Sequence, residues 1–79
     1  MTQEEIKLAL DDIQSSANIL YKRYDATSEA TECFHKGNLQ GMKIALQHAK
    51  EKAERRAKTD NYANAVIYKI NCLQKELED

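Results

Sequence analysis

The sequence predicts an all-α fold, either a small antiparallel three-helix bundle or an extended helical hairpin with a long first helix. The chain has no proline and only two glycines, and charged residues make up 32% of it. This composition is typical of long helices in water, and the scarcity of valine and threonine disfavours strands. Apolar residues also recur every three or four positions in three separate stretches, which is the periodicity of one-sided helices.

The first helix is expected from about residue 3 to residue 34. Thr2 and Glu5 have the spacing of a capping box, in which the hydroxyl and the carboxylate each accept a backbone N–H of the other residue. An apolar seam then follows at spacings of three and four residues, which places its members on one face. The seam consists of Ile6, Leu10, Ile13, Ala17, Leu20 and Tyr24.

Two residues and one segment complicate this first helix. Leu8 and Ile19 lie off the seam, and we expect them to widen the apolar stripe. After Tyr24 the seam positions are taken by threonine, and Asp25-Ala26-Thr27-Ser28 offers several cap-like side chains. Nothing there forces a break, so we expect a continuous helix. The alternative is a turn near residues 25–28 followed by a short second helix.

The second helix is expected over residues 39–58. Gly37 can take the left-handed backbone that ends the preceding helix, and Asn38 can cap the next one. Four-residue spacing of small side chains on its inner face would let a neighbouring backbone approach closely. The expected buried face is Met42, Ala45, Leu46, Ala49 and Ala53.

The last helix is expected over residues 61–77, after a boundary at Thr59-Asp60-Asn61, three residues that are all good caps. Its apolar stripe is Ala63, Val66, Ile70, Leu73 and Leu77, broadened by Ile67 and Tyr62. The alternative fuses the second and third helices into one rod, which would give the helical hairpin.

Length and composition point to a single domain over residues 1–79 that works with a partner. A core in a chain this short seldom supplies more than about 3–5 kcal/mol of net stability, and many of its apolar residues are alanine. Docking on a larger protein or homo-oligomerisation would supply the rest. The acidic, polar N-terminus and the lack of a long apolar window predict no signal sequence and no membrane partner. Two cysteines suit the reducing cytoplasm.

Positive charge is concentrated in the second helix. The net charge is −1, but residues 43–58 hold six bases and two acids, or +4. In an antiparallel hairpin that turns near residue 37, residues 50–58 lie opposite residues 15–23, and the last helix would offer Lys69 to the region of Lys50. The candidate anion or nucleic-acid contacts are Lys22, Arg23, Lys50, Lys52, Arg55, Arg56, Lys58 and Tyr21.

This basic surface has two interpretations. Arg55 and Arg56 would contact phosphates of DNA or RNA while a tyrosine stacks on a base. An ordinary solvated helix side is the favoured interpretation, because Glu51 and Glu54 are placed for i,i+4 pairs with Arg55 and Lys58. Dedicated nucleic-acid domains are also usually net basic, and this chain is not.

No catalytic, cofactor-binding or metal-binding residues are predicted. The acidic pairs are adjacent in sequence, so on a helix they point about 100° apart and do not converge as an acid–base pair would. The soft metal ligands do not match a zinc spacing, and we interpret the cysteines as small, partly buried residues. Those ligands are Cys33, His35, His48 and Cys72.

The sequence therefore favours a non-enzymatic accessory or adaptor protein that binds a larger protein partner, such as part of a nucleic-acid-processing machine. The alternative is a nucleic-acid-binding accessory protein that uses the basic second helix. A further alternative is a self-associating coiled-coil structural protein. An exposed apolar stripe on the first or last helix would support the adaptor hypothesis.

Overall fold

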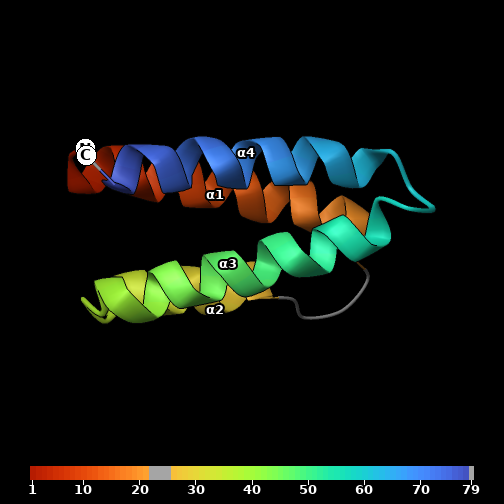
Figure 1. Cartoon of the computed structure of the whole chain (residues 1–79). Helices are drawn as coiled ribbons and strands as arrows, with labels where there is room; N and C mark the ends of the chain where they lie inside the picture. Colours follow the sequence, from red (N-terminus) through yellow and green to blue (C-terminus); the bar gives the residue numbers. More distant parts are fainter. Residues whose placement is uncertain (22–25, 79) are drawn as a thin grey trace.

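The structure, a computed structural model, describes residues 1–21 and 26–78, and these residues form an antiparallel bundle of four helices. The helices are α1 (Gln3–Leu20), α2 (Ala26–His35), α3 (Leu39–Arg56) and α4 (Tyr62–Glu78). Figure 1 shows α1 and α4 side by side in one layer and α2 and α3 in the other. Each helix packs against two neighbours, α1 against α2 and α4, and α3 against the same two. Successive helices run in opposite directions, as in an up-down-up-down bundle.

The all-α class is confirmed, but the expected helix from residue 3 to residue 34 is wrong. Tyr21 has an extended backbone (φ −118°, ψ 134°) that ends α1 at Leu20. Helix α2 then runs back alongside α1 (Figure 1). The three-helix and hairpin descriptions are therefore both replaced by four helices in the described residues. The link at residues 22–25, which includes Tyr24 of the predicted seam, lies outside the described residues.

The physical reason for two helices in place of one is the length of the available partners. A continuous helix over residues 3–34 would be about 48 Å long at ~1.5 Å per residue. Helices α3 and α4 have 18 and 17 residues, so half of the long helix would have no neighbour. Folding back buries the α2 residues Thr27 and Ala30 against the bundle instead.

The start and the buried face of α1 follow the sequence pattern. The Thr2 hydroxyl accepts the Glu5 N–H at 3.1 Å, and the Glu5 carboxylate accepts the Thr2 N–H at 3.2 Å, which confirms the capping box. The backbone and hydroxyl hydrogen bonds of Thr2 lower the pKa of Glu5. The expected seam residues that the structure describes are all buried, namely Ile6, Leu10, Ile13, Ala17 and Leu20.

The turn between α2 and α3 has the expected chemistry. Gly37 has a φ of +76°, and the N–H groups of Gly37 and Asn38 donate to the carbonyls of Phe34 (3.0 Å) and Cys33 (2.9 Å), which is a Schellman motif. The Asn38 side chain caps α3 by accepting the Gly41 N–H at 2.9 Å. At the end of α2, the ion pair of Glu32 with Lys36 (2.9 Å) lowers the pKa of Glu32 and raises that of Lys36.

Helix α3 ends at Arg56, and α4 is a separate helix, so the fused rod is wrong. The Arg56 carbonyl accepts the N–H groups of Thr59 (3.1 Å) and Asp60 (2.9 Å). The Asp60 carboxylate then accepts the Tyr62 N–H at 2.9 Å, which starts α4. These bonds form at the predicted boundary. The expected buried faces are confirmed for α3 at Met42, Ala45, Leu46, Ala49 and Ala53, and for α4 at Ala63, Val66, Ile70 and Leu73.

Candidate functional site

The structure gathers part of the predicted anion-binding set at one end of the bundle. A shallow hollow there is lined by Tyr21, Lys52, Arg55, Arg56 and Thr59, and we call it the basic hollow. The ammonium group of Lys52 lies over the Tyr21 ring, 4.5 Å from its centroid, which is a cation–π contact. Because Lys52 covers this ring face, a nucleic-acid base would have to displace it in order to stack there.

The other predicted contacts are not part of the basic hollow. Lys58 follows the end of α3 and is exposed. Lys50 lines a different groove, between α3 and α4. Lys22 and Arg23 lie outside the described residues. Lys69, expected near Lys50, instead points to α1, where its Nζ lies 3.1 Å from an Asp12 carboxylate oxygen.

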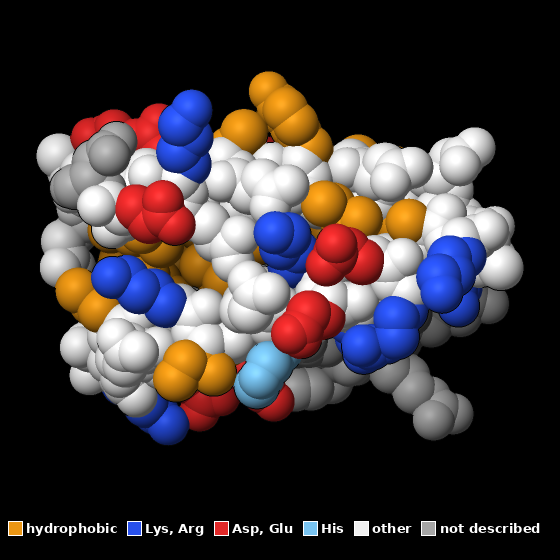
Figure 2. All heavy atoms as spheres, viewed as in Figure 1, with side chains coloured by type: hydrophobic (Ala, Val, Ile, Leu, Met, Phe, Trp, Pro, Cys, Tyr) orange, Lys and Arg blue, Asp and Glu red, His pale blue; other side chains and the backbone are white. Residues whose placement is uncertain are grey.

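The basic side chains of the hollow form no salt bridge within the described part of the chain. There, no carboxylate lies within 4 Å of the charged groups of Arg55, Arg56 or Lys58, so the expected pairs with Glu51 and Glu54 do not form. Figure 2 shows Lys and Arg side chains gathered at the end of the bundle where α3 ends, with Asp and Glu side chains between them. Basic residues in a last helical turn also compensate the helix dipole, so the cluster has a structural role of its own.

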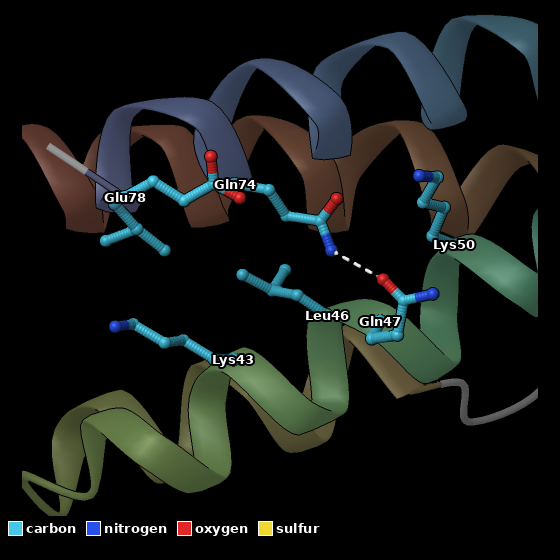
Figure 3. Close-up of a pocket in the computed structure, with 7 residues that line it drawn as sticks. Lys43, Leu46, Gln47, Lys50, Gln74 and Glu78 are labelled. Atoms are coloured by element: carbon cyan, nitrogen blue, oxygen red, sulfur yellow. Dashed lines mark hydrogen bonds between the residues drawn. The ribbon is translucent and has the colours of Figure 1, made fainter.

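A polar groove of about 330 Å³ runs between α3 and α4. Figure 3 shows Lys43 and Lys50 flanking Leu46 on the α3 side, while Gln47 and Gln74 meet across the groove. The Gln74 side chain donates to the Gln47 side chain at 3.1 Å. This hydrogen bond between two side chains joins the layers across the groove.

A second groove, of about 350 Å³, runs between α1 and α4 and is mainly apolar. Its lining includes Met1, Ile13, Tyr68, Cys72 and Leu73. The Tyr68 side chain is 70% exposed, as expected for a tyrosine off the α4 stripe.

The two α1 residues expected to widen the apolar stripe are instead in water. Leu8 is 59% exposed and Ile19 is 72% exposed. At about 100° per residue, both positions point roughly 150° away from the centre of the α1 core stripe, which explains why that expectation is wrong. We call the outer surface of this layer, with Leu8, Ile19, Tyr68 and the groove beside them, the α1/α4 face. Figure 2 shows hydrophobic surface at the edge of the molecule where these helices lie, projecting at one place.

The α1/α4 face was not predicted, although the spacing of two apolar residues in the sequence indicates it. Leu8 and Ile19 are eleven residues apart, which is close to three helical turns, so they share one stripe on the side opposite to the seam. Leu8 and Ile19 could belong to the core only if the buried stripe of α1 were much wider than the one its seam residues form.

One polar cluster, of which only Ser16 is buried, fastens α1 to α4. Lys69 Nζ donates to the Ser16 hydroxyl at 2.7 Å and to the Asp12 carboxylate at 3.1 Å. Ser16 is only 5% exposed. A lysine that donates to the serine is not placed to accept its proton, and the serine has little access to a substrate. The cluster therefore acts as a strut between the two helices.

The described residues contain no group of three or more His, Cys, Asp or Glu side chains that could hold a metal ion. Both thiols are free, and Cys33 on α2 lies diagonally across the bundle from Cys72 on α4. In the part of the chain that the structure describes, no helix is both long enough and apolar enough to cross a membrane.

Comparison of the chain with models of protein families, with curated proteins and with solved structures found no match.

Proposed function

We propose that this protein is a small non-enzymatic adaptor that binds a larger protein partner through the α1/α4 face. The observation that supports the proposal is the exposure of Leu8, Ile19 and Tyr68 on one layer of the bundle. Large apolar side chains that are exposed on one face of a bundle favour removal from water by a partner. The small core of the chain supplies little net stability, so a partner that covers this layer would also stabilise the fold.

The proposal is tested by photo-crosslinking in cells with a photoreactive residue placed at Ile19 or Tyr68. Control positions are Ile44 and His48, which are exposed on α3 in the other layer. We expect a discrete crosslinked protein from the α1/α4 positions and none from the α3 positions. Crosslinks from the α3 positions alone would contradict the proposal.

A second candidate function, nucleic-acid binding, is supported by the guanidinium groups of Arg55 and Arg56 in the basic hollow, which form no ion pair with the described residues. It predicts that labelled DNA or RNA binds more weakly as salt rises, and that Arg55→Ala and Arg56→Ala each weaken binding to every sequence tested. Lys75→Ala, on exposed α4 surface, is the matched control. Fluorescence anisotropy that is insensitive to both arginine substitutions would eliminate this candidate.

A further inference from the structure

The exposed leucine of α1 is surrounded by carboxylates. Two acids precede Leu8, Glu4 by four residues and Glu5 by three. Two more follow it, Asp11 by three residues and Asp12 by four. Residues at these spacings are the neighbours of a side chain on a helix surface. All four acids are exposed, so the apolar side chain of Leu8 has an acidic border on every side along the helix.

Little positive charge is available nearby to neutralise this border. Helix α1 carries four acids and one base, Lys7, which gives a net charge of −3. Of the four carboxylates, Asp12 pairs with Lys69 and Glu5 accepts the Thr2 N–H of the cap. Glu4 and Asp11 have no ion-pair partner in the described residues. Glu76 adds a further carboxylate to the groove beside them.

The apolar side chains of this face are spread along α1. Leu8 and Ile19 lie on one side of that helix about 16 Å apart, from eleven residues at ~1.5 Å each, with Asp12 and Ser15 between them. Tyr68 lines the mainly apolar groove between α1 and α4. Apolar anchors spaced along a helix, with carboxylates beside them, match the shape and chemistry of an amphipathic helix laid along α1.

We infer that the partner places a basic amphipathic helix on the α1/α4 face, an inference that rests on the proposed function. The leucine-type anchors of that helix would cover Leu8, Ile19 and Tyr68. Its lysines and arginines would face Glu4 and Asp11, the carboxylates that have no ion pair within the described chain. Charge complementarity of this kind selects partners and speeds their encounter.

The same charges disfavour a second copy of this chain as the occupant. Pairing two α1/α4 faces about a twofold axis would bring the acids of both α1 helices to one interface. Bringing the net charge of −3 of each α1 helix into one interface is unfavourable.

The inference is tested on the full chain with two synthetic helical peptides of about 18 residues, long enough to span the ~16 Å stripe. Both carry the same leucine seam, flanked by lysine in one peptide and by glutamate in the other. We expect the lysine peptide to bind in anisotropy titrations, more weakly at about 0.5 M than at about 0.15 M salt. Chemical-shift changes should map to α1 and α4.

Surface substitutions provide the matched controls. The double variant Leu8→Ser with Tyr68→Ser should weaken binding of the lysine peptide about tenfold or more. The double variant Glu4→Gln with Asp11→Asn should weaken it and reduce its salt dependence. Ile44→Ser and the pair Glu51→Gln with Glu54→Gln, on α3, should leave it unchanged. All of these residues are exposed, so circular dichroism should show intact helices in every variant.

Three results would overturn the inference. Equal or preferred binding of the glutamate peptide, mapped to α1 and α4, would reject the basic partner while leaving the α1/α4 face as a docking surface. Failure of the lysine peptide to bind would also reject it, whereas the crosslinking experiment above separately decides the adaptor proposal. If sedimentation shows a dimer of the parent and a monomer of the Leu8→Ser variant, the α1/α4 face would instead bind a second copy of this chain.

Discussion

Gly37 is the residue on which the turn between α2 and α3 depends. Its φ of +76° is in the left-handed region, and no atom outside the turn would obstruct a side chain there. Any cost of substitution therefore comes from the backbone alone. Gly41 is a different case, because a Cβ at that position would lie 2.6 Å from Asn38 Nδ2 and disturb the cap.

Gly37→Ala should lower the free energy of unfolding by about 1 kcal/mol, the usual cost of left-handed backbone for an alanine. Gly37→Asn should cost less, because asparagine tolerates this conformation. Urea unfolding followed by circular dichroism measures both. An alanine variant as stable as the parent would show that the turn does not require this conformation.

Ser16→Ala should lower the free energy of unfolding by about 1 kcal/mol, because Lys69 loses a hydrogen-bond acceptor in a partly buried place. Ser15→Ala is the matched control, since Ser15 is exposed on the same turn of α1. Both substitutions gain the same helix propensity. The difference between their free energies of unfolding therefore measures the contribution of the Ser16–Lys69 hydrogen bond. A Ser16 variant no less stable than the Ser15 variant would contradict its stabilising role.

At the scale of the helices, α3 is distinguished by small buried side chains. Ala45, Ala49 and Ala53 are at most 5% exposed and lie at four-residue intervals. Alanine at these positions lets neighbouring helices pack closely against α3, while the α3 stripe supplies only Met42 and Leu46 as large core residues. The stability of this helix therefore depends on close approach more than on buried volume.

Ala53→Leu should lower the free energy of unfolding by about 1–3 kcal/mol, because the fully buried site has no room for three more carbon atoms. Ala65→Leu, on exposed α4 surface, should change it by less than about 0.5 kcal/mol. Thermal unfolding of both variants compares them. Equal midpoints would show that α3 is not closely packed.

The start of α1 and the end of α2 give stability a dependence on pH. The pKa values of Glu5 and Glu32 are lower in the folded protein than their ordinary value of 4.5. Their stabilising contribution is therefore complete above that value and is lost as the pH falls through the folded pKa. The raised pKa of Lys36 acts oppositely, since its contribution is lost as the pH rises through a value above 10.5.

Glu5→Gln should make the free energy of unfolding less dependent on pH between about pH 5 and pH 3, because one carboxylate that binds protons more weakly when folded is removed. Glu4→Gln, one residue earlier and outside the capping box, should leave the slope closer to that of the parent. Denaturant titrations at several pH values measure these slopes. Identical slopes for the Glu5 variant and the parent would contradict the capping box in solution.

At the scale of the whole molecule, the two layers differ in charge. Helices α1 and α4 together carry −3, from −3 on α1 and zero on α4, whereas α2 and α3 together carry +1, from −2 and +3. The bundle thus presents an acidic face with exposed apolar side chains and, in the other layer, a basic hollow. This separation is what supports two distinct docking hypotheses for one small chain.

The return of α2 alongside α1 can be tested by the distance between spin labels at Lys7 and Glu32. In the bundle these positions should lie within about 20 Å, because packed helices are ~8–10 Å apart. One continuous helix would separate them by about 37 Å, from ~1.5 Å for each of the residues between them. Pulsed dipolar spectroscopy distinguishes the two distances. The longer distance would show that residues 3–34 form one continuous helix.

Part of the candidate site was also predictable. Antiparallel pairing over a continuous first helix placed residues near position 21 opposite those near position 52, and Tyr21 does contact Lys52. The contact arises differently, however, because α1 ends at Leu20 and does not pack against α3. The same argument failed for Lys69, because its place depends on how α4 packs against α1. The side of α1 that carries Leu8 and Ile19 follows from their positions in the sequence, but whether another helix covers that side depends on how the bundle packs.

The sequence by itself determined the caps, the glycine turn, the two later helices and their buried faces. These features depend on hydrogen bonds and periodicities within a few residues, which local chemistry fixes. Only the tertiary structure decided the break after Leu20, the pairing of Lys69 with Asp12 and Ser16, and the α1/α4 face. Each of these depends on which helices become neighbours, and that choice is made by the burial of whole faces against one another.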